Sequence, residues 1–71
     1  MVISPIHRHH ANRIAAYLAD RFRDYDDPGF DDAANTLSDF YAYTHGLSDL
    51  DRSALHYWTY LRVSELWTEV G

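Results

Sequence analysis

The segment HGLSDLD, residues 45–51, contains the end of one predicted helix and the start of the next. Gly46 accepts the left-handed backbone that commonly ends a helix, and Leu47 is placed for the hydrophobic contact that accompanies this ending. Ser48 is followed three residues later by the acid Asp51, an aspartate variant of the capping box that opens a helix. We therefore predict helices over about residues 31–45 and 49–70, joined by a short connection.

A second interruption, DDPG at residues 26–29, precedes these two helices. Proline lacks an amide hydrogen and glycine tolerates positive φ, so a helical run ends there. Ser4 and Pro5 suit the N-cap and the first position of an earlier helix. Apolar residues recur after them at the three-and-four spacing of one helix face: Ile6, Ala11, Ile14, Ala15, Leu18, Phe22 and Tyr25. These patterns predict a helix over residues 5–25 and an all-α fold, a small three-helix bundle.

The chain has 71 residues, is 46% hydrophobic and lacks cysteine, so burial of apolar side chains must stabilise one helical domain over residues 1–71. Below about 70–80 residues a single core supplies only a few kcal/mol of net stability, and oligomerisation is a common remedy. No apolar run approaches the roughly 20 residues of a membrane span or the centre of a signal peptide. We expect a cytoplasmic protein that does not associate with membranes.

Acidic residues are concentrated in the middle of the chain. Seven of the eleven acids are aspartates between positions 20 and 39, and the formal net charge is −5. This excess disfavours direct binding of DNA or RNA, which requires clustered lysine or arginine. It can steer the chain towards a basic protein surface, or simply keep a small apolar protein soluble. The acidic candidates for partner binding are Asp26, Asp27, Asp31 and Asp32.

The predicted third helix carries more apolar surface than one core requires. At about 100° per residue, one stripe contains Leu50, Ala54, Tyr57, Trp58 and Leu61. The other side holds further candidates for partner binding: Tyr60, Val63, Leu66 and Trp67. A second apolar face implies burial against something else. Three interpretations follow: the first two helices cover both faces, the second face forms a homodimer, or it binds another protein.

Two arrangements resemble metal sites but are incomplete. Asp24, Asp26 and Gly29 match the first, third and sixth positions of an EF-hand calcium loop. Pro28 stands at the fifth position, which requires an oxygen ligand, and Asn35 stands at the twelfth, which requires a bidentate glutamate. The histidines near the amino terminus lack the cysteine or carboxylate partners of a zinc site: His7, His9 and His10. We expect no bound metal and no cofactor.

Motifs for catalysis and DNA recognition are also missing from the sequence. There is no P-loop, no glycine-rich dinucleotide motif and no nucleophile elbow. A helix-turn-helix would place Asp49 and Asp51 towards phosphates, which repel them. We therefore expect no catalytic residues.

The remaining features favour a non-enzymatic protein-binding module. In its overall character, a short acidic helical chain, the protein is similar to small inhibitors encoded by phages and mobile elements, including anti-CRISPR proteins. The resemblance implies inhibition of a larger, nucleic-acid-binding protein complex in a host cytoplasm by occlusion of a basic surface. One alternative is a structural homo-oligomer, namely a dimer paired through the aromatic third helix. The other is a metal-binding regulator that uses Asp24 and Asp26 or the histidines.

Overall fold

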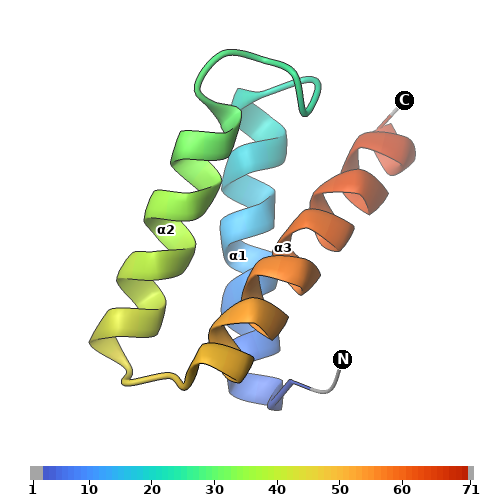
Figure 1. Cartoon of the computed structure of the whole chain (residues 1–71). Helices are drawn as coiled ribbons and strands as arrows, with labels where there is room; N and C mark the ends of the chain where they lie inside the picture. Colours follow the sequence, from blue (N-terminus) through green and yellow to red (C-terminus); the bar gives the residue numbers. More distant parts are fainter. Residues whose placement is uncertain (1–2, 71) are drawn as a thin grey trace.

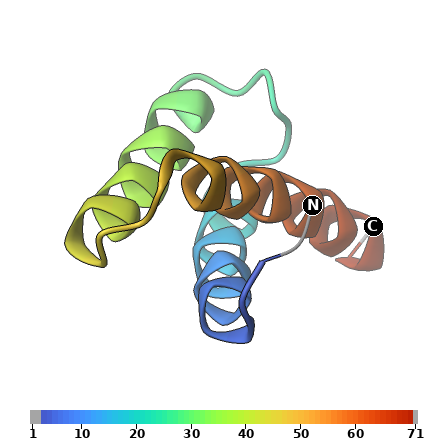
Figure 2. The same ribbon diagram turned by 60° about the horizontal axis from the view of Figure 1, so that its bottom comes forward.

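The computed structural model describes residues 3–70 and contains three helices: α1 (Pro5–Arg21), α2 (Phe30–Thr44) and α3 (Asp49–Val70) (Figure 1). Helices α1 and α2 lie side by side, and α3 runs obliquely across α1 (Figure 2). No strand occurs among the described residues. The predicted all-α three-helix bundle is thus confirmed.

The turn between α2 and α3 has the predicted capping structure. Gly46 adopts a φ of 63°, and the Leu47 amide donates to the Ala42 carbonyl oxygen at 2.9 Å. This is the six-to-one hydrogen bond of a Schellman ending. Ser48 Oγ then accepts a hydrogen bond from the Asp51 amide at 3.1 Å. The observed helices match the predicted ranges to within one residue at each end.

Helix α1 begins after the predicted cap, Ser4, but ends four residues before the end of the predicted range 5–25. Phe22 already has an extended backbone, with φ −124° and ψ 154°. The Asp27 carboxylate accepts hydrogen bonds from the two backbone amides that follow Phe22. Because this side chain competes for amides that a longer helix would use, the helix stops there. Tyr25, which periodicity placed on a helix face, instead lies in the α1–α2 loop.

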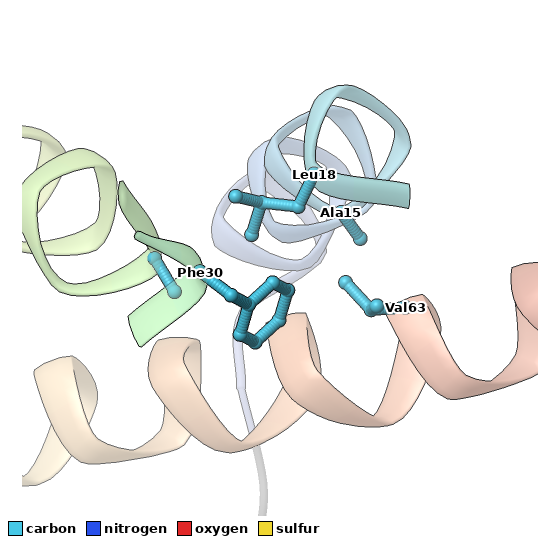
Figure 3. Close-up of a cluster of buried hydrophobic side chains, with 5 residues drawn as sticks. Ala15, Leu18, Phe30 and Val63 are labelled. Atoms are coloured by element: carbon cyan, nitrogen blue, oxygen red, sulfur yellow. The ribbon is translucent and has the colours of Figure 1, made fainter. Parts of the chain in front are cut away.

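The core consists of two clusters, each with residues from all three helices. The cluster nearer the α1–α2 loop is shown in Figure 3 and comprises Ala15, Leu18, Phe30, Ala34 and Val63. The cluster nearer the α2–α3 turn comprises Ala11, Tyr41 and Leu55. Helix α3 therefore contacts both α1 and α2 through these two clusters.

This packing replaces the expectation of a free second face on α3. Val63, predicted on that face, is fully buried. Tyr60, Leu66 and Trp67 pack, partly buried, against the cluster that contains Val63. Of the three interpretations, coverage by the first two helices therefore holds for the face that contains Val63, whereas the other stripe is covered only in part. Exposed apolar side chains lie on the other stripe: Leu50 at 73%, Tyr57 at 50% and Leu61 at 39%.

Ser38 is a buried residue whose hydroxyl has no hydrogen-bond partner in the part of the chain that the structure describes. An unsatisfied buried polar group costs about 1–3 kcal/mol. Ser38→Ala is therefore expected to raise the free energy of unfolding by about 1 kcal/mol, as measured by urea denaturation. Thr59→Val is the matched control, because the Thr59 hydroxyl is equally buried but donates to the Leu55 carbonyl at 2.8 Å. A Ser38→Ala variant less stable than the wild type would contradict this account.

Candidate functional site

The acidic end of the bundle, defined as residues 20–32, is its most strongly charged region. It comprises the last two residues of α1, the α1–α2 loop and the first turn of α2, at the top of Figure 1. It holds six aspartates and two arginines, a formal charge of −4 within a chain of −5. The structure thus brings the four acidic candidates to one end of the molecule: Asp26, Asp27, Asp31 and Asp32.

Two aspartates of this end organise the loop itself. The Asp27 carboxylate accepts from the Arg23 and Asp24 amides, and the Asp24 carboxylate accepts from the Asp26 amide at 3.2 Å. Backbone bonds from the Asp27 amide to the Asp24 carbonyl and from the Phe30 amide to the Asp27 carbonyl, both 3.1 Å, tighten the chain further. Asp27 is accordingly half-buried and acts within the loop.

Aromatic side chains fasten this loop to α3. The Tyr25 ring stacks on Tyr60 with centroids 5.6 Å apart and an interplanar angle of 8°, and its hydroxyl donates to the Tyr60 carbonyl at 3.0 Å. Trp67 Nε1 donates to the Phe22 carbonyl at 2.9 Å. The Phe30 ring makes T-shaped contacts with Tyr25 and Tyr60, with ring centroids 5.4 Å and 5.5 Å apart. Tyr60 and Trp67, predicted as partner contacts, therefore position the acidic loop from within the protein.

Tyr60 also links α3 to the first turn of α2. Its hydroxyl donates to Asp31 Oδ1 at 2.8 Å. Burial, reinforced by the hydrogen bond and the negative charge of Asp31, raises the pKa of Tyr60 to about 12. The hydroxyl consequently stays protonated at neutral pH and continues to donate to Asp31. The Asp31 carboxylate is held in one place while it remains exposed to solvent.

Of the four acids predicted to bind a partner, Asp26 and Asp32 are left for an external partner. Both are exposed, and within residues 3–70 neither carboxylate takes part in a hydrogen bond or ion pair. Asp32 lies in the first turn of α2, where the helix dipole favours negative charge. Sequence reasoning found these two residues and the apolar character of Tyr60 and Trp67. It missed the role of Tyr25, whose only signal is its position next to the helix-breaking segment.

Two shallow surface grooves lie outside the acidic end. One, of about 210 Å³, lies between α2 and α3 and is lined by Asn35, Asp39, Arg52, Ser53 and His56. Arg52 Nη1 lies 3.3 Å from Asp39 Oδ1 there, as an exposed ion pair. The other, of about 340 Å³, follows the second half of α3 and is lined by Leu61, Ser64, Glu65, Thr68 and Glu69. Both are open to solvent, so neither encloses a small molecule.

Among the residues that the structure describes, no three histidine, aspartate or glutamate side chains are grouped so that they could hold a metal ion. None of the helices in this part of the chain has both the length and the apolar character required to cross a bilayer. Comparisons of the chain with protein-family models, curated proteins and solved structures found no match. The arrangement of the acidic end is therefore the basis for a functional proposal.

Proposed function

We propose that the protein is a non-enzymatic protein-binding module that docks its acidic end on a basic protein surface. The observation that carries this proposal is the attachment of the acidic loop to α3 by Tyr25 and Trp67. Inhibition follows if the covered surface is one that the partner uses to bind nucleic acid, as in anti-CRISPR-like inhibitors of phage origin. The site of action would then be the cytoplasm of a host cell.

The ordered loop makes this binding mode favourable in two ways. Association normally costs free energy to order side chains and loops, and a loop already held in place avoids much of that cost. The local charge of −4 also attracts a basic partner over a distance of about one Debye length, roughly 8–10 Å in physiological salt. Asp26 and Asp32 provide exposed carboxylates for arginine or lysine side chains.

The binding mode can be tested with an arginine-rich peptide as the probe and fluorescence anisotropy as the measurement. Asp26→Asn combined with Asp32→Asn is expected to weaken binding by about 5–30-fold, because each exposed charge pair contributes up to about 1 kcal/mol. Added salt is expected to reduce the difference. Circular dichroism should show that the variant keeps its helices.

The matched control is Asp49→Asn combined with Asp51→Asn, in the first turn of α3 at the opposite end of the bundle. Both double variants change the formal net charge from −5 to −3, so they differ only in where the charge is lost. Equal weakening by the two would mean that binding follows net charge alone. That result would contradict a site at the acidic end.

Self-association is the second candidate function, and one observation favours it. Leu50, Tyr57 and Leu61 are exposed and lie on one stripe of α3, spaced seven and four residues apart. A homodimer through this stripe would show twice the mass of the 8.3 kDa chain in light scattering. Tyr57→Glu would then restore the monomer, because it places a charge within the apolar contact.

A further inference from the structure

Three histidines surround one tyrosine at the end of the bundle opposite the acidic loop. Tyr41 is only 6% exposed, and its hydroxyl lies 2.9 Å from His7 Nδ1. The His10 ring stacks on Tyr41 with centroids 4.4 Å apart and an interplanar angle of 30°. The His45 ring stacks on it at 4.1 Å and 29°. We call His7, His10, His45 and Tyr41 the histidine cluster.

The histidine cluster joins the beginning of α1 to the end of α2. His7 and His10 belong to the first turns of α1, whereas Tyr41 lies in the last turn of α2 and His45 is its C-cap. Tyr41 is also part of the smaller core cluster, against which side chains from α3 pack. The α3 neighbours Leu55 and Trp58 bring no titratable group to this contact. The titratable groups here therefore come from α1 and α2.

Every charged neighbour that acts on His10 is a base. Burial lowers the pKa of His10 below 6.5, and the positive charges of Arg13, His45, His9 and His7 lower it further. No carboxylate offsets them in this set. The folded state thus favours neutral His10 more than the unfolded state does. The contribution of neutral His10 to the stability of the fold is complete above about pH 6.5. It is lost as the pH falls towards the lower pKa that His10 has in the folded state.

We propose that the histidine cluster is an acid-sensitive joint, which holds α1 against α2 when its rings are neutral and opens this end of the bundle when they bind protons. Two observations carry the proposal. The His10 and His45 rings both stack on a nearly buried tyrosine and their centroids are 5.9 Å apart, so protonation places like charges close together in a partly desolvated site. The face of the Tyr41 ring can stabilise one imidazolium through a cation–π interaction. A second imidazolium at this distance repels the first.

The core cluster at the acidic end does not depend on these rings. It contains Ala15, Leu18, Phe30, Ala34 and Val63, none of which titrates. The joint is therefore expected to open locally, with the acidic end still folded. The histidine cluster and the acidic end lie at opposite ends of the bundle, so opening of the cluster and binding at the acidic end can be tested separately.

Amide hydrogen exchange followed by NMR between pH 7.5 and pH 5.5 tests the local opening. Protection factors, corrected for the pH dependence of intrinsic exchange, are expected to fall several-fold at Ala11 and Tyr41, because protonation destabilises this end of the bundle. Protection at Leu18 and Ala34 is expected to stay within about twofold over the same range. A parallel fall at both ends would indicate global acid destabilisation and overturn the proposal.

A pair of variants tests whether the histidine rings cause the opening. His10→Phe combined with His45→Phe keeps aromatic rings on Tyr41 but removes both imidazoles, and is expected to abolish the fall in protection. His56→Phe removes an imidazole that stacks on Tyr60, away from Tyr41, and is expected to retain the fall. Persistence of the fall in the first variant would overturn the proposal.

If the first variant does not fold, the side-chain resonances of the wild type give an independent answer. The His10 ring is expected to titrate below pH 6.5, with the Tyr41 ring resonances moving at the same midpoint. Tyr41 resonances that stay constant through the His10 titration would show that no joint opens.

Discussion

Phe30→Ala is expected to lower the free energy of unfolding by about 3–5 kcal/mol, the usual cost of removing a buried phenylalanine ring. Because a single core in a chain of 71 residues supplies only a few kcal/mol of net stability, this loss is comparable to the whole. Phe30 is fully buried, and its ring meets the rings of Phe22, Tyr25 and Tyr60 edge-on. A substantially unfolded variant at 25 °C, seen as a loss of helical circular dichroism, is the expected result.

Phe40→Ala provides the control, because it removes the same ring from the same helix at a position that is 71% exposed. Its cost is expected to be within about 0.5 kcal/mol. Equal losses from the two substitutions in urea denaturation would mean that Phe40 is also covered, either by another copy of the chain or by a different packing of α2. The difference between the two variants therefore tests the assignment of the core.

The three helices were predictable because local chemistry determines their ends. Ser4, Gly46 and Ser48 act on backbone groups within a few residues, so their effect is visible in the sequence. The early end of α1 was not predictable, because the Asp27 side chain turns back and accepts hydrogen bonds from amides that precede it. Periodicity counted Tyr25 as helical since its spacing fits, and spacing contains no information about that competing hydrogen bond.

Which face of α3 packs inward could be predicted only with tertiary information. Periodicity showed correctly that the helix has two apolar sides, but a helical pattern does not state which neighbour covers which side. The oblique placement of α3 puts Leu55 and Val63 into two core clusters and leaves Tyr57 and Leu50 exposed. The face first considered for a partner is therefore packed inside this chain, and the available apolar stripe is the other one.

The candidate site was partly predictable for the same reasons. Charge counting located the acidic end, because the aspartates are adjacent in sequence. Their division into loop-forming Asp24 and Asp27 and available Asp26 and Asp32 depends on backbone geometry. The histidine cluster was not predicted at all, since His45 and His10 are far apart in the sequence and meet only across the α1–α2 contact.

Trp67→Ala is expected to cost about 3 kcal/mol of unfolding free energy, near the lower end for aromatic truncations because the ring is only partly buried. It removes ring contacts with Tyr25 at 5.0 Å and Phe30 at 5.7 Å, together with the hydrogen bond to the Phe22 carbonyl. The loop should then exchange its amides faster than the helices do. Trp67→Phe keeps a ring but loses the N–H donor, and is expected to cost about 1 kcal/mol.

The two Trp67 variants also separate an anchoring role from a direct contact with a partner. If the indole only positions the acidic loop, Trp67→Phe should weaken binding of the arginine-rich peptide in proportion to the increase in loop exchange. If the indole touches the partner, affinity should fall while loop exchange and stability stay unchanged. Tyr57→Ala on the outer stripe of the same helix, at 50% exposure, is the control for both measurements. It removes an aromatic ring without touching the loop, so a comparable gain in loop exchange in that variant would contradict the attachment through Trp67.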